Sequence, residues 1–185
     1  MALDLLNEDM TALIVTPGPG RAGTIRIDAG ARLEMAESTI STETEGFGDA
    51  GAVTIGADMI LLGNGAQIRS DASDLAPGQA GTVSLSGQEI KLAAGARVTT
   101  GSANGTTAGG IAVTATGMVM ITGSSSQISS ANSAGGSGGA AGNILVSAPR
   151  ITLGPGGTIT TSALAGAAGQ IELALPDTGL LRLAG

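Results

Sequence analysis

The stretch that decides the fold is AGAVTIGADMILLGNGAQIRS, residues 50–70, taken together with AGTVSLSGQEIKLAAGARVTT, residues 80–100. The two segments align without a gap. Each contains three short runs in which aliphatic residues alternate with small or polar ones, and in the first segment the runs contain Val53 and Ile55, Ile60 and Leu62, and Ile68. A period of two is typical of a strand with one buried face. Each segment therefore predicts three strands, separated by corners rich in glycine and alanine.

The Ala-Gly pair that begins both segments recurs along the whole chain. It stands at positions 22, 50, 80, 108, 141 and 168, and the residues after it always place two aliphatic side chains two apart, as in AGTIRI, AGAVTI, AGTVSL, AGGIAV, AGNILV and AGQIEL. The third run has its own aliphatic column: Ile40, Ile68, Val98, Ile128 and Ile159. Two residues after each of these comes a small hydroxyl residue: Thr42, Ser70, Thr100, Ser130 or Thr161. The chain is therefore a repeat.

A triplet of short strands cannot bury its apolar edge alone, but coils stacked at about 4.8 Å cover one another. The repeat predicts an all-β fold, a parallel β-helix. The preference for right-handed crossovers between parallel strands predicts that this β-helix is right-handed. We expect five complete coils of 27–33 residues at 22–49, 50–79, 80–107, 108–140 and 141–167. Residues 1–21 would form a partial coil or cap, and residues 168–185 a partial coil.

The register of the first coil has an alternative, because IRIDAGARL at 25–33 matches IKLAAGARV at 90–98 as well as it matches a first strand. The Ala-Gly pair at 22 and Ile40 favour the register given above. Composition alone, rich in Gly, Ala, Ser and Thr, would also suit a disordered linker. A linker has no reason to place aliphatic residues at the same offsets in six successive repeats.

Composition also excludes several classes of function. The chain has no Cys, His, Trp or Tyr, and Phe47 is its one aromatic residue. Disulfide scaffolds, zinc sites and Ser-His or Cys-His catalytic pairs are thereby excluded. A net charge of -7 argues against nucleic acid as a partner. No apolar run is long enough to span a bilayer, so no membrane insertion is expected.

The amino terminus, MALDLLNEDMTALIV, carries Asp4, Glu8 and Asp9 where a secretory signal would carry basic residues and an apolar run. The chain is therefore either cytosolic or a piece of a longer exported protein, and we favour the second interpretation.

The repeat columns, with motifs such as GNGAQI at 63–68 and GARV at 95–98, resemble the β-strand repeats of filamentous haemagglutinin-like exoproteins, the adhesins exported by two-partner secretion. The resemblance covers nearly the whole chain, although no counterpart of the family's secretion domain is visible. It implies a non-catalytic shaft segment of an extracellular, outer-membrane-associated adhesin, stacked on the rest of a longer β-helix. Contacts with a host or neighbouring cell would then come from loops or from parts outside this sequence.

An acidic stretch, ESTISTETEGFGD at 37–49, contains Glu37, Glu43, Glu45 and Asp49. Carboxylates gathered on a loop could hold Ca²⁺, and Glu43, Glu45 and Asp49 are the candidate ligands. Neither an EF-hand pattern nor the nonapeptide GGxGxDxUx is present, so a solvated acidic turn is the alternative. Asp71 and Asp74 have the same two interpretations. The sequence predicts no catalytic residue and no cofactor.

Three other functions have to be weighed. A polysaccharide-active β-helix enzyme would need paired carboxylates and usually aromatic sugar platforms. An ice-binding β-solenoid would need regular outward Thr ranks, whereas the outward positions beside the third column are Ser41, Arg69, Thr99, Ser129 and Thr160. The sequence LPDTG at 175–179 matches a cell-wall sorting motif, but by register it lies at a corner between strands and lacks the apolar span such a signal needs.

Overall fold

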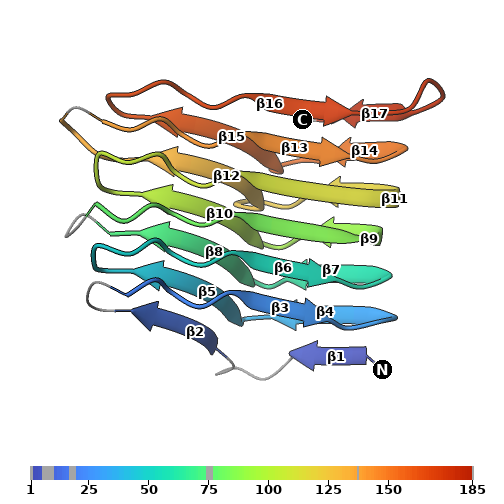
Figure 1. Ribbon diagram of the computed structural model, residues 1–185. Helices are drawn as coiled ribbons and strands as arrows, with labels where there is room; N and C mark the ends of the chain where they lie inside the picture. Colours follow the sequence, from blue (N-terminus) through green and yellow to red (C-terminus); the bar gives the residue numbers. More distant parts are fainter. Residues whose placement is uncertain (1, 6–10, 17–19, 74–76, 137, 185) are drawn as a thin grey trace.

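The computed structural model describes residues 2–5, 11–16, 20–73, 77–136 and 138–184 (Figure 1). These residues contain strands and no helix, and every pair of neighbouring strands is parallel. The coils lie one on another from the N-terminal to the C-terminal end, as Figure 1 shows. The predicted parallel β-solenoid of about five turns is confirmed.

Each complete coil contains a first, a second and a third strand segment, and equivalent segments of successive coils pair with one another. The first segments are β3 (Ile25–Asp28), β6 (Val53–Gly56), the start of β9 (Val83–Leu92) and of β11 (Ile111–Ile121), β13 (Ile144–Ser147) and β16 (Ile171–Ala174). The second are β1 (Ala2–Leu5), β4 (Arg32–Ala36), β7 (Met59–Gly63), the ends of β9 and β11, β14 (Arg150–Leu153) and β17 (Leu180–Leu183). The third are β2 (Thr11–Thr16), β5 (Thr39–Thr44), β8 (Gln67–Ala72), β10 (Arg97–Ser102), β12 (Gln127–Asn132) and β15 (Thr158–Ala163).

Strand pairing decides between the two registers of the first coil. Ile25 pairs with Val53, so residues 25–28 form a first segment, as the favoured register requires. The third-strand column is also confirmed, because Ile40, Ile68, Val98, Ile128 and Ile159 pair in succession.

Residues 80–100 differ from the expected three separate strands. The pattern predicts a break after the first run, whereas β9 continues from Val83 to Leu92 and pairs with β6 and then with β7. A Cβ at Gly87 would lie 2.3 Å from the carbonyl oxygen of Ala57, so only glycine lets the chain turn this close to the coil before it. β11 turns in a similar way, with a register irregularity between Ala115 and Met118.

The core is the set of aliphatic columns inside the stack. Ile55, Leu85 and Val113 are at most 1% exposed and pair in register, which confirms that they point inward at equivalent places. Ile60 and Ile90 form a second such column, and Ile68 and Val98 a third. Stacked thin layers of Ile, Leu and Val thus bury apolar surface without aromatic rings.

The hydroxyl column closes the third corner, which joins each third strand to the next coil. Thr42 Oγ1 donates to the carbonyl oxygen of Gly51 (2.6 Å), and Ser70 Oγ donates to the same oxygen (3.0 Å). The N–H of Gly81 donates to Ser70 Oγ (2.9 Å). Thr100, Ser130 and Gly142 repeat this arrangement around the carbonyl oxygen of Gly109. The buried hydroxyls therefore satisfy backbone groups of the Ala-Gly corner, which would be costly to leave unpaired.

Candidate functional site

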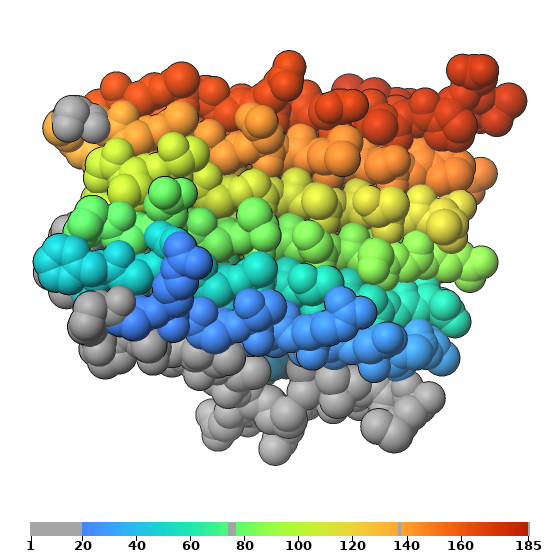
Figure 2. All heavy atoms as spheres, viewed as in Figure 1, coloured from blue at the N-terminus to red at the C-terminus, as the bar shows by residue number. Residues whose placement is uncertain are grey.

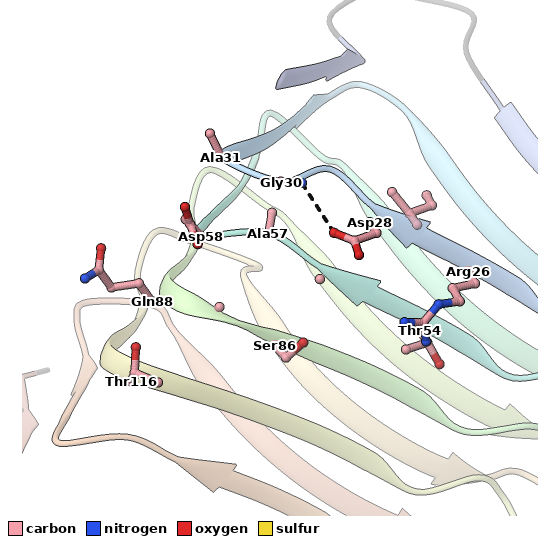
Figure 3. Close-up of a pocket in the computed structure, with 13 residues that line it drawn as sticks. Arg26, Asp28, Gly30, Ala31, Thr54, Ala57, Asp58, Ser86, Gln88 and Thr116 are labelled. Carbon is pink, nitrogen blue, oxygen red and sulfur yellow. Dashed lines mark hydrogen bonds between the residues drawn. The ribbon is translucent and has the colours of Figure 1, made fainter. Parts of the chain in front are cut away.

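A polar groove lies over the first corner, where first strands turn into second strands (Figure 3). Its volume is about 790 Å³, and it crosses β3, β6, β9 and β11. Its lining residues are Arg26, Ile27, Asp28, Gly30, Ala31, Thr54, Gly56, Ala57, Asp58, Ser86, Gly87, Gln88 and Thr116. Residues far apart in the sequence meet here because equivalent corners of successive coils stack.

The groove is hollow because its floor is built from glycine and alanine, as at Gly56, Ala57 and Gly87. Backbone hydrogen bonds between coils hold this floor. The N–H of Asp58 donates to the carbonyl oxygen of Gly30 (2.7 Å), and the N–H of Gln88 donates to the carbonyl oxygen of Asp58 (2.7 Å). The side chains of Asp58 and Gln88 project from the corner (Figure 3). The polar groups of the groove therefore stand on a backbone that is hydrogen-bonded from coil to coil.

The groove offers carboxylates, a guanidinium, hydroxyls and an amide, but no aromatic surface. Asp28 Oδ1 accepts a hydrogen bond from the N–H of Gly30 (3.4 Å), which turns that carboxylate toward its own corner. Arg26 and Thr54 lie on neighbouring strands further from the corner (Figure 3). Such a surface can hold water and small polar groups. Sugar binding usually adds an aromatic platform, which this groove does not contain.

The candidate calcium ligands lie apart from one another. Glu43 lies on the outer face of β5, next to Arg69 and Asp71, and Glu45 is exposed on the following loop. Asp49 forms an ion pair with Arg21 (2.9 Å) and accepts a hydrogen bond from the N–H of Gln79 (3.1 Å).

Of the three other acids that the sequence suggested, Asp71 lies beside Glu43 as its register partner. Glu37 is exposed at a corner, with a φ of 52°, and Asp74 lies outside the described residues. Within the described ranges, no three His, Cys, Asp or Glu side chains are grouped so that they could hold a metal ion.

A charged cluster on the outer face of the third strands escaped the sequence analysis. Glu43 of β5 and Asp71 of β8 are register partners, and Arg69 approaches both carboxylates at 3.7 Å. Arg69 Nε also donates to Ser41 Oγ (3.1 Å). A comparison of equivalent positions in successive repeats could have found this cluster, because Glu43 and Asp71 each lie three residues after an aliphatic member of the third column.

Burial raises the pKa of Asp71 to about 6, the nearby Arg69 opposes this, and the Glu43 carboxylate adds to it. A hydrogen bond from the backbone of Gly101 also lowers this pKa. Gly101 leaves room for this carboxyl group, because the Cβ of any other residue at position 101 would lie 2.8 Å from Asp71 Oδ1. The carboxyl group therefore lies against the coil above and is only 26% exposed to water.

The remaining sequence motifs lie where the register placed them. LPDTG occupies the corner between β16, which ends at Ala174, and β17, which begins at Leu180. The N–H of Gly179 donates to the carbonyl oxygen of Pro176 (2.7 Å), so the motif forms a turn. The outward positions beside the third column pair in succession from coil to coil: Ser41, Arg69, Thr99, Ser129 and Thr160. Arg69 interrupts this row of small hydroxyl side chains. No helix among the described residues is long and apolar enough to cross a membrane.

Comparison of this chain with protein-family models, with curated proteins and with solved structures finds no match.

Proposed function

We propose that this chain is a non-catalytic structural segment of the shaft of a secreted, surface-associated adhesin or exoprotein. Its role is to extend a β-helix, so that binding parts elsewhere in the protein are held away from the cell. Localisation at the cell surface and any contact with a host or neighbouring cell are parts of this proposal.

The observation that carries the proposal is the apolar surface of the C-terminal end of the stack. Of the six large apolar side chains exposed among the described residues, five belong to this end: Leu164 (72%), Ile171 (42%), Leu180 (52%), Leu181 (41%) and Leu183 (69%). Two of the equivalent positions one coil earlier are covered, because Ile144 and Ile151, the partners of Ile171 and Leu181, are at most 1% exposed. Figure 2 shows this last coil, in red, as the top layer of the stack.

This surface has the same columns that each inner coil presents to the next. Ile171 pairs with Ile144, and Leu181 pairs with Ile151, so both continue aliphatic columns that are buried below them. A further coil with the same repeat would cover these side chains and pair with the free edges of β15, β16 and β17. A shaft made of many such coils is therefore the assembly that this end fits.

Surface labelling of intact cells tests the proposal. An antiserum raised against the whole chain is applied to living cells that express the gene, before and after treatment with an external protease, with a cytosolic protein as the control antigen. We expect labelling of intact cells that the protease removes. Labelling that requires permeabilised cells, at the level of the cytosolic control, would contradict a role at the cell surface.

A further inference from the structure

The outer face of the second strands carries alternating charged and apolar rows. We call it the second-strand face, and it consists of the outward side chains of β4, β7, β9, β11 and β14. The charged rows are Arg32 with Glu34 and Glu89 with Lys91, and the apolar rows between and after them are Met59 with Leu61 and Met118 with Met120. These side chains point outward, because the residues between them, such as Leu33 and Ile60, are fully buried inside the stack.

The charged rows remain accessible to a partner. Arg32 Nε donates to Glu34 Oε2 (3.0 Å), yet the two side chains are 43% and 34% exposed. Arg32 Nη1 also lies 3.8 Å from Met59 Sδ, so the guanidinium borders the apolar row. Within each of these two rows one side chain is acidic and the other basic, and Arg150 of β14, the register partner of Met118, adds one positive charge at the end of the face.

The rows of β4, β7, β9 and β11 are each complementary to themselves under a two-fold rotation, whereas in the β14 row Arg150 would face Thr152 of the other copy. Consider a second copy that is rotated by 180° about an axis parallel to the stack. Its second-strand face then lies against the second-strand face of the first copy. Each coil lies opposite the same coil of the other copy, and the facing strands run in opposite directions. The two outward residues of a row then exchange places. Glu89 of each copy meets Lys91 of the other, Arg32 meets Glu34, Met59 meets Leu61, and Met118 meets Met120.

We propose that the second-strand face binds a second copy of this chain, giving a side-by-side dimer of two parallel stacks related by a two-fold axis along the stack. Isologous contacts of this kind require a self-complementary surface, which the alternating rows provide. Opposite charges facing one another fix the register between the copies. Beside Leu61 lies a hollow of about 260 Å³, bordered by Ala36, Gly63 and Ala93, which leaves room for the flexible side chain of the other copy's Met59.

The size of the face sets the expected strength. Five strands at about 4.8 Å make it roughly 24 Å tall and only one short strand wide, which puts it at the low end of specific interfaces. A dissociation constant in the micromolar range is expected for this chain, and a longer shaft with more rows would associate more tightly.

Substitutions that reverse the charges of Glu89 and Lys91 test the proposal. The dimer dissociation constant of the whole chain is measured by sedimentation equilibrium at low salt. Lys91→Glu sets carboxylates against each other at two equivalent places, and Glu89→Lys does the same with ammonium groups, so each variant should dimerise at least about tenfold more weakly than the parent. The double variant Glu89→Lys/Lys91→Glu restores both attractive pairs, and so does an equimolar mixture of the two single variants. Both should return to within about threefold of the parent affinity.

Arg97→Glu is the matched control, because it changes net charge as much as Lys91→Glu does but lies exposed on the third-strand face. Its affinity should equal that of the parent. A parent chain that stays monomeric at millimolar concentration would overturn the proposal. So would a dimer that Lys91→Glu does not weaken, as expected if the copies meet through the apolar end of the stack. Failure of the double variant to restore affinity would exclude the two-fold axis along the stack.

Discussion

The Cβ that Gly81 lacks would lie 2.2 Å from the carbonyl oxygen of Gly51, its equivalent in the preceding coil. The same close approach recurs where Gly51, Gly109, Gly142 and Gly169 pass over the coil before them, at 1.8–2.1 Å. The glycine of each Ala-Gly pair is therefore required because the backbones of successive coils touch there. This is the physical reason for the motif that marks each repeat.

Gly81→Ala should accordingly destabilise the fold by about 3 kcal/mol, because the new methyl group has to push two backbones apart. Gly63→Ala is the matched control: no atom lies within 4 Å of its ideal Cβ, and a change within about 0.5 kcal/mol is expected. Urea unfolding followed by far-ultraviolet circular dichroism measures both, since the chain has no Trp or Tyr. Equal stability of the two variants would show that the coils do not touch at the Ala-Gly corner.

Ser38 and Ser126 occupy equivalent buried positions, each just before its third strand, but only one hydroxyl is paired. Ser126 Oγ accepts a hydrogen bond from the N–H of Gly95 (3.0 Å), whereas Ser38 Oγ is buried without a partner among the described residues. Ser38→Ala should stabilise the fold by about 0.5–1 kcal/mol, and Ser126→Ala should cost about 1–2 kcal/mol by leaving that N–H unpaired. Thermal unfolding compares them, and a loss of stability in both variants would contradict the assignment.

Asp71 should make the protein less stable as the pH rises from about 4 to about 6. Burial raises the pKa of this carboxyl group from 3.8 in the unfolded chain to about 6 in the fold. The protonated carboxyl group of Asp71 therefore makes its full contribution to the stability of the fold below the pKa of the unfolded chain. This contribution is lost as the pH rises through the pKa of the folded chain. Asp71→Asn should stabilise the protein by about 1–3 kcal/mol at pH 7.5 and change little at pH 3.5. An unchanged slope of stability against pH in this variant would contradict the prediction.

Glycans should neither be cleaved by this chain nor bound tightly, because the groove over the first corner has no aromatic platform. A glycan array probed with the whole chain should show no specific binding at micromolar concentration. If binding appeared and Asp58→Asn or Gln88→Ala abolished it, the groove would be a carbohydrate site and the shaft proposal would be incomplete.

The sequence predicted the features that depend on periodic burial. Aliphatic residues such as Ile68 and Val98 recur at fixed offsets because each must point into the stack, so the columns and the pairing of coils followed from spacing alone. The hydroxyl column was visible too, but its hydrogen bonds to the Ala-Gly corner depend on how the third corner folds back. The continuity of β9 could not be predicted, because it depends on how closely Gly87 can approach Ala57.

The candidate site was less predictable. The groove is formed by small residues of four coils that are distant in sequence, and no single motif marks it. The candidate calcium ligands were chosen because they are close in sequence. In a β-solenoid, however, neighbours in space lie about one coil apart, as Glu43 and Asp71 do. Searching along columns would have replaced the proposed loop site with the cluster around Arg69.

Leu85 and its chain neighbour Ser84 test most directly whether each coil is held by the coils on either side of it. Leu85 is 1% exposed between Ile55 and Val113, whereas Ser84 points outward between the same strands. Leu85→Asp should cost several kcal/mol by burying a carboxyl group between apolar layers, and Ser84→Asp should cost about 0.5 kcal/mol or less. Amide hydrogen exchange on both variants should show the Leu85→Asp damage spreading first to the coils that begin at Ala50 and Ala108. Equally mild effects of the two substitutions, or a larger effect of Ser84→Asp, would contradict the stacked columns and the shaft that we propose from them.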